Sequence, residues 1–181
     1  MRIAVFCGSS RHAEHRFTQP ARALGAEIAR RGHTLVFGGG RTGLMGCLAD
    51  AALETGGRVE GVILDRFVEQ GVHHPGVDVM HTVTDMRARK AGLDERADAF
   101  VALPGGYGTL EELTEILSLR KIGLHQRRLV LFDMDGFFSG LLAQIERGIA
   151  TGFDAAEVRD YFVVTDEIAA VVDLCEASLT D

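Results

Sequence analysis

Cysteine is scarce in this sequence of 181 residues, which has three, at Cys7, Cys47 and Cys175. They are odd in number and widely spaced, and no C-x-x-C pair occurs, so the sequence indicates neither a disulfide framework nor a zinc site. We read them as reduced thiols, mostly buried. Cys7 ends an apolar run, where a nucleophile could lie, but no base is identifiable beside it, and a core thiol is the favoured interpretation.

Long apolar runs and clustered basic residues are also missing. No run reaches the ~18 residues of a membrane span. The chain enters a strand-like segment at Arg2 instead of a signal peptide, so we expect a cytoplasmic protein without a membrane partner. The formal net charge of −7 disfavours nucleic acid as a partner. With 46% hydrophobic and 25% charged residues, the chain fits a single globular domain over residues 1–181.

Patterns that bind cofactors are few. Lys90 and Lys121 are the only lysines, and neither lies in a recognisable context for the Schiff base of a pyridoxal-phosphate enzyme. The histidines are not accompanied by an H-E-x-x-H motif or an acidic ligand set. We therefore expect neither a cofactor nor a metal.

Apolar runs alternate with segments of helical periodicity along the chain. Strands are expected at residues 2–7, 33–37, 58–64, 77–83, 98–103, 128–132 and 161–164. Helices are expected at residues 17–31, 85–95, 109–122 and 137–150, and a loop at 66–76. This alternation predicts an α/β fold with a Rossmann-like, doubly wound parallel sheet, arranged as three α/β/α layers in a single domain.

Three glycine-rich turns follow the first, second and fifth predicted strands, at residues 8–10, 38–46 and 104–109. In a parallel sheet these turns lie at the carboxyl edge, where ligands bind. The third turn opens a helix, whose free N–H groups and positive dipole end favour a phosphate. Its glycines can adopt positive φ angles and approach a ligand closely. Because the P-loop lysine is absent, a monophosphate fits better than a triphosphate.

The second turn contains G-x-G-x-x-G from Gly38 to Gly43, which is also the fingerprint of dinucleotide-binding proteins. Asp65 could be the acidic residue of that fingerprint, yet no second domain is left to hold a dehydrogenase substrate. A tight turn that lets the helix pack closely on the sheet is the favoured interpretation.

Two charged residues stand out, and each has a purely structural alternative. Glu112 lies close to the predicted phosphate turn, but Thr109-Leu110-Glu111-Glu112 also matches the S/T-x-x-E capping box, in which the glutamate bonds back to the cap. Arg89 could be an ordinary exposed arginine, one of four basic residues within positions 87–96. Both alternatives stay open at this point.

The motifs together resemble the LONELY GUY (LOG) family, cytokinin riboside 5′-monophosphate phosphoribohydrolases that are often mislabelled as lysine decarboxylases. The specific part is P-G-G-x-G-T-x-x-E from Pro104 to Glu112, preceded by M-x-x-R-K at Met86, Arg89 and Lys90. The resemblance runs along almost the whole chain. Supporting segments are Cys7-Gly8-Ser9-Ser10, residues 38–40, residues 43–46, Gly123-Leu124-His125 and Asp135-Gly136-Phe137-Phe138.

The resemblance implies that Arg89 and Glu112 are catalytic and that the backbone of residues 105–109 binds the 5′-phosphate. The substrate-binding residues that it implies are Gly39, Met86, Lys90, Gly105, Gly106, Tyr107, Gly108, Thr109, Leu110 and Glu111. Residues 117–122 differ from the aromatic-containing segment of many relatives, which leaves the base pocket open.

The implied reaction is hydrolysis of the N-glycosidic bond of an N6-modified AMP, which releases the adenine base and ribose 5-phosphate. Cleavage builds oxocarbenium-like charge on the sugar. Glu112 could stabilise this charge, or it could direct water to C1′. An arginine such as Arg89 stays protonated and suits charge stabilisation. The alternatives are an AMP nucleosidase without N6 preference and a non-catalytic carrier of a phosphate-bearing cofactor, which would not need this pair of residues.

The resemblance also implies a homodimer with sites near the subunit interface. Apolar side chains that one small domain would leave partly uncovered are Leu117, Leu119, Ile122 and Leu124.

Overall fold

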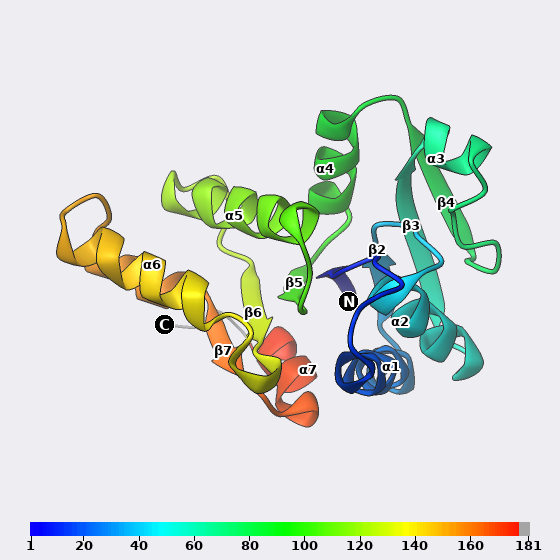
Figure 1. The fold of residues 1–181 in the computed structure, drawn as a ribbon, viewed down its shortest axis with the longest axis horizontal. Helices are drawn as coiled ribbons and strands as arrows, with labels where there is room; N and C mark the ends of the chain where they lie inside the picture. Colours follow the sequence, from blue (N-terminus) through cyan, green and yellow to red (C-terminus); the bar gives the residue numbers. More distant parts are fainter. Residues whose placement is uncertain (178–181) are drawn as a thin grey trace.

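The computed structural model describes residues 1–177 and shows a seven-stranded sheet whose strand pairs are all parallel (Figure 1). The strands are β1 (Arg2–Phe6), β2 (Thr34–Phe37), β3 (Arg58–Leu64), β4 (Val79–Val83), β5 (Ala99–Ala102), β6 (Arg128–Phe132) and β7 (Val163–Thr165). Their order is β4-β3-β2-β1-β5-β6-β7, which runs outward in both directions from β1. The predicted doubly wound parallel sheet is confirmed.

Helices cover both faces of this sheet. They are α1 (His15–Arg30), α2 (Gly43–Glu54), α3 (Asp65–Glu69), α4 (Met86–Glu95), α5 (Tyr107–Lys121), α6 (Ser139–Ala150) and α7 (Ile168–Glu176), with 3-10 turns η1 (Met134–Gly136) and η2 (Ala156–Tyr161). Helices α1, α2 and α7 lie together on one face, and α4, α5 and α6 lie on the other (Figure 1). None of the helices within residues 1–177 has the length and apolar character to cross a bilayer.

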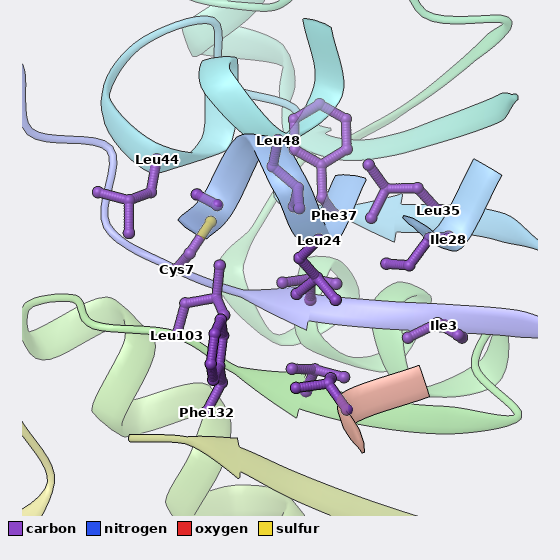
Figure 2. Packing of buried hydrophobic residues seen from close by; sticks show 14 of the residues in the cluster. Ile3, Cys7, Leu24, Ile28, Leu35, Phe37, Leu44, Leu48, Leu103 and Phe132 are labelled. Atoms are coloured by element: carbon purple, nitrogen blue, oxygen red, sulfur yellow. The ribbon is translucent and has the colours of Figure 1, made fainter. Parts of the chain in front are cut away.

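The central strand β1 is buried on both faces, as its uninterrupted apolar sequence predicts. Ile3 and Val5 belong to the core under α1, α2 and α7, whereas Ala4 and Phe6 belong to the core under α4 and α5. Figure 2 shows the first of these cores, where side chains of α1 and α2 pack on those of β1 and β2. The sheet is therefore a rigid platform whose carboxyl edge can position a site.

Several element boundaries differ from the prediction. Residues 66–76, predicted as a loop, contain most of α3, which is too short for helical periodicity to reveal. Helix α5 begins at Tyr107 instead of Thr109, because Gly106 is its N-cap. Helix α6 begins at residue 139, after the 3-10 turn at 134–136, and not at residue 137. Strands β4 and β7 begin two residues later than predicted.

Candidate active site

The turns after β1, β2 and β5 lie side by side at the carboxyl edge of the sheet, because β2 and β5 both pair with β1. They surround a cavity of about 580 Å³, whose lining is completed by residues of β3, α3, α4 and α5. A second hollow of about 500 Å³ lies at the ends of β6 and β7, away from all three glycine-rich turns. The first cavity is therefore the candidate active site.

Gly8 ties the three turns together through its backbone. Its N–H donates to the carbonyl of Pro104 at 3.0 Å, and its carbonyl accepts from the N–H of Leu44 at 2.9 Å. A β-carbon at Gly43, where φ is +62°, would lie 2.9 Å from the oxygen of Gly8. The turn at 38–46 thus needs glycine for its close contact with the turn after β1, whereas the structural interpretation of G-x-G-x-x-G concerned the packing of the helix on the sheet.

Arg89 of α4 and Glu112 of α5 form a buried ion pair in the wall of this cavity. Arg89 Nη1 lies 2.7 Å from Glu112 Oε1, and the two residues are 7% and 5% exposed. Arg89 also donates from Nε to the carbonyl of Val62 and from Nη2 to the carbonyl of Gly38. These bonds fix the guanidinium, so the alternative of an exposed helical arginine is wrong.

The carboxyl group of Glu112 is not used to cap its helix. Gly106 is the N-cap of α5, and no side chain bonds to that cap. Oε1 accepts from Arg89, while within residues 1–177 no protein group donates to Oε2. The capping-box alternative is therefore wrong, and Glu112, which lines the cavity, keeps one carboxyl oxygen without a donor from these residues.

Burial raises the pKa of Glu112 above its ordinary value of 4.5, although the Arg89 guanidinium acts in the opposite direction. Glu111 and Glu115 on the same helix add a smaller contribution that also raises this pKa. A carboxyl group with a raised pKa, facing a cavity and paired with one specific cation, is typical of active sites.

Gly38 is required by the position of Arg89. A β-carbon at residue 38 would lie 2.3 Å from Arg89 Nη2 and 2.9 Å from the end of the Met45 side chain. Any larger residue would push the guanidinium away from Glu112. The second glycine-rich turn therefore supports the charged pair directly, which the sequence did not reveal.

The turn at 104–109 presents the start of α5 to the cavity. The cavity lining includes Gly106, Tyr107, Gly108 and Thr109, so unpaired N–H groups of the first helical turn are available to an anion. Thr109 is 4% exposed. Glycine permits positive φ angles at residues 105, 106 and 108, but none of these three residues has one.

Residue 105 must be glycine because a side chain would not fit there, and not because the backbone has a positive φ angle. A β-carbon at this position would lie 2.0 Å from Thr109 Oγ1 and 2.9 Å from the nitrogen of Gly8. The residue does not line the cavity.

Four other predicted substrate-binding residues also lie outside the cavity lining: Gly39, Lys90, Leu110 and Glu111. Lys90 Nζ lies 3.0 Å from Glu111 Oε1 and 3.0 Å from Glu115 Oε2, so it joins α4 to α5. A β-carbon at Gly39 would contact Ile63 of β3. Met86 does line the cavity, at the start of α4.

The sequence missed an apolar wall on the β3 side of the cavity. Its members, apart from Met86, are Met45, Ile63, Phe67 and Val72. Phe67 and Val72 fall in the segment predicted as a loop, and no sequence signal connects them with the glycine-rich turns. The cavity is therefore polar and glycine-rich at β5 and apolar at β3.

Cys7 lines the floor of the cavity but is not suited to nucleophilic attack. It is 2% exposed, and its pKa is raised by burial and further by the nearby Glu112 carboxylate. A thiol that resists ionisation is a poor nucleophile. This favours the interpretation of Cys7 as a core thiol.

Comparison with known proteins places this chain in a family. A family model described as "Possible lysine decarboxylase" matches residues 45–175. The cytokinin riboside 5′-monophosphate phosphoribohydrolase of Rhodococcoides fascians is 41% identical over 172 residues, which cover 94% of this chain and 86% of that protein. The chain belongs to the LOG family. The Arabidopsis thaliana phosphoribohydrolase LOG3 is 38% identical over 162 residues, covering 90% of this chain and 75% of its own length.

Solved structures show the same fold at lower identity. The molybdenum cofactor binding protein of Rippkaea orientalis has a TM-score of 0.73 and 21% identity, with 99% of this chain and 97% of that chain covered. The molybdenum cofactor carrier protein of Chlamydomonas reinhardtii has a TM-score of 0.70 and 21% identity, with 95% and 93% covered. At this identity the likeness concerns the fold alone.

The lysines of this LOG protein do not fit the description "Possible lysine decarboxylase". Lys90 is engaged by two carboxylates, and Lys121 Nζ lies 2.5 Å from Asp154 Oδ1. Neither lysine lines the cavity. A Schiff-base lysine would have to be free and inside the site.

Proposed function

We propose that this protein is a phosphoribohydrolase that cleaves the N-glycosidic bond of N6-modified adenosine 5′-monophosphates to the free base and ribose 5-phosphate. Relatives at about 40% identity carry the name of this activity. The observation that carries the proposal is the buried Arg89–Glu112 pair, 2.7 Å apart, beside the free N–H groups at the start of α5.

The geometry suits this chemistry step by step. The N–H groups of residues 106–109 bind the 5′-phosphate, which places the ribose in the cavity. As the C1′–N9 bond breaks, the Glu112 carboxylate stabilises the oxocarbenium-like sugar or orients the attacking water. The water oxygen bonds to C1′, and a proton and the former bonding electron pair leave with the base. Arg89 holds Glu112 in place and supplies positive charge next to the developing anion.

One experiment tests the proposal and its alternatives. The purified protein is incubated with N6-isopentenyladenosine 5′-monophosphate, AMP and the unphosphorylated N6-isopentenyl riboside, and free base is separated by chromatography. We expect the most free base from the isopentenyl nucleotide, less from AMP, and none from the riboside. The riboside has no phosphate and therefore cannot bind to the phosphate turn. Equal rates with both nucleotides would favour an AMP nucleosidase. If neither nucleotide releases free base, the proposed enzyme activity is contradicted and a non-catalytic carrier is favoured.

We also propose that the protein acts in the cytoplasm as a homodimer. Ile122, Leu124 and Phe153 are 68%, 69% and 83% exposed. They lie near one another, because Lys121 at the end of α5 binds Asp154, which follows Phe153. Leu117 and Leu119, also expected at the interface, pack partly against the core. Such exposed apolar residues favour a protein interface.

Light scattering tests the oligomeric state. We expect a mass of twice the 19.6 kDa of the chain. Ile122→Asp should shift the population toward the monomer, whereas Glu157→Asp on the exposed η2 turn should not. A monomer of the unaltered protein at all concentrations would contradict the dimer.

A further inference from the structure

The stretch that follows β3 and lines one side of the cavity contains a single buried side chain. Between Asp65 and Ala88, a stretch that the structure describes throughout, His74 is the only residue classed as buried, at 7% exposure. This stretch includes α3, which has no buried residue of its own. It nevertheless supplies Phe67 and Val72 to the apolar wall.

His74 is held by both of its ring nitrogens. Nδ1 accepts from the N–H of Gly76 at 3.2 Å, so Nε2 carries the proton and donates to Asp50 Oδ1 of α2 at 3.0 Å. The imidazole also meets the ring of Phe37 edge-on, with centroids 6.4 Å apart. The side chain is thus fixed to the main core and to α2 at once.

The backbone around His74 transmits this anchoring to the cavity. The N–H of His74 donates to the carbonyl of Gly39 at 2.8 Å, and the carbonyl of Val72 accepts from the N–H of Arg41 at 3.1 Å. His73 and Gly40 form an antiparallel bridge between these two bonds. Residues 72–74 therefore form a short strap across the second glycine-rich turn, and Val72 stands at its cavity end.

The strap lies on the side of the cavity that the base of a bound nucleotide would reach. The phosphate turn follows β5 and the apolar wall follows β3, and these strands are three positions apart in the sheet, or about 14 Å. A nucleoside monophosphate bound by its phosphate at β5 would reach toward β3 with its base. The wall there is apolar, which suits an alkyl or alkenyl substituent on N6.

We infer that His74 is a positioning residue that sets selectivity for the N6 substituent by fixing the strap and its Val72 against α2 through Asp50. The inference rests on the proposed function. His74 does not line the cavity and contacts neither Arg89 nor Glu112, so it acts on the fit of the substrate and not on bond cleavage.

Steady-state kinetics of the variants test the inference. For His74→Ala we expect the KM for N6-isopentenyladenosine 5′-monophosphate to rise about tenfold, with kcat within about twofold and with a smaller change in the KM for AMP. Asp50→Ala, at a side chain that is 52% exposed, should give the same pattern without endangering the fold. His74→Gln keeps a donor for Asp50 and should restore part of the selectivity. His73→Ala, next to it in the strap, is the matched control and should leave both KM values unchanged.

Hydrogen exchange gives a readout that does not depend on activity. Amides of residues 65–76 should exchange faster in His74→Ala and Asp50→Ala than in the unaltered protein or in His73→Ala. Unchanged exchange in this stretch would overturn the anchoring role. Faster exchange with unchanged selectivity, or equal losses for both nucleotides, would overturn the role in selectivity. If the unaltered protein cleaves neither nucleotide, the proposed function fails, which is a separate result.

Discussion

The two sides of the cavity are held in different ways. On the side of α4 and α5, Arg89 and Glu112 are buried, and Leu93 and Leu113 join the same helices to the sheet. On the side of α3, no residue of the helix is buried, and His74 is the only buried residue between Asp65 and Ala88, the stretch that supplies Phe67 and Val72 to the wall. The charged pair is thus embedded in the core, whereas the part of the wall that α3 and the residues after it supply, Phe67 and Val72, is not buried and should tolerate substitution at little cost to folding.

The largest effect on activity is expected from a substitution on the side of α4 and α5, where the charged pair is buried. Glu112→Gln should lower turnover at least about a thousandfold, because the neutral amide cannot stabilise the oxocarbenium-like sugar. Base release from the isopentenyl nucleotide measures this loss. Glu111→Gln is the matched control, since its carboxylate binds Lys90 outside the cavity, and it should retain activity within about twofold. Equal losses in both variants would contradict the assignment of Glu112.

Truncating one apolar side chain on the α4 side and one on the α3 side compares how much each side of the cavity contributes to the free energy of unfolding. Leu93 is 2% exposed, so Leu93→Ala should cost about 2–5 kcal/mol of unfolding free energy, whereas Phe67→Ala should cost less than about 1 kcal/mol. Urea unfolding followed by circular dichroism measures both. A larger loss for Phe67→Ala would remove the distinction between the two sides.

The pH dependence should report the burial of Glu112. Because burial raises its pKa above 4.5, the loss of kcat/KM on acidification should be centred above that value. Protonation of a group whose pKa is raised by folding favours the folded state, and this contribution is lost as pH rises through the folded pKa. Glu112 therefore does not cause acid unfolding, and activity should return at neutral pH. A loss centred at or below pH 4.5 would contradict the raised pKa.

The smallest effect is expected at the start of α4, the helix that carries Arg89. Asp85 Oδ1 accepts from the N–H groups of Arg87 at 2.8 Å and Ala88 at 3.0 Å. Asp85→Ala should cost about 1 kcal/mol of unfolding free energy, and Asp85→Asn, which also caps helices, only a few tenths. Equal costs for the two variants would show that capping by this side chain does not stabilise the helix.

Local patterns predicted the sheet and the place of the site. Apolar runs such as residues 58–64 indicated buried parallel strands, and the glycine-rich turns after β1, β2 and β5 indicated the edge at which a ligand binds. Lys90 and Glu111, by contrast, belong to the same motifs as Arg89 and Glu112 but bind each other outside the cavity. Neighbours in a motif on a helix point in different directions, which spacing alone did not resolve.

The sequence by itself determined the fold class and the position of Glu112 close behind a glycine-rich turn, because both depend on local periodicity and on residue types in short motifs. Only the tertiary structure decided that Glu112 faces Arg89 and not its own helix cap, since that bond joins residues 23 apart in the chain. It also decided that His74 bonds to Asp50, which lies 24 residues earlier, on α2. Contacts of this range form only when the sheet brings its turns together.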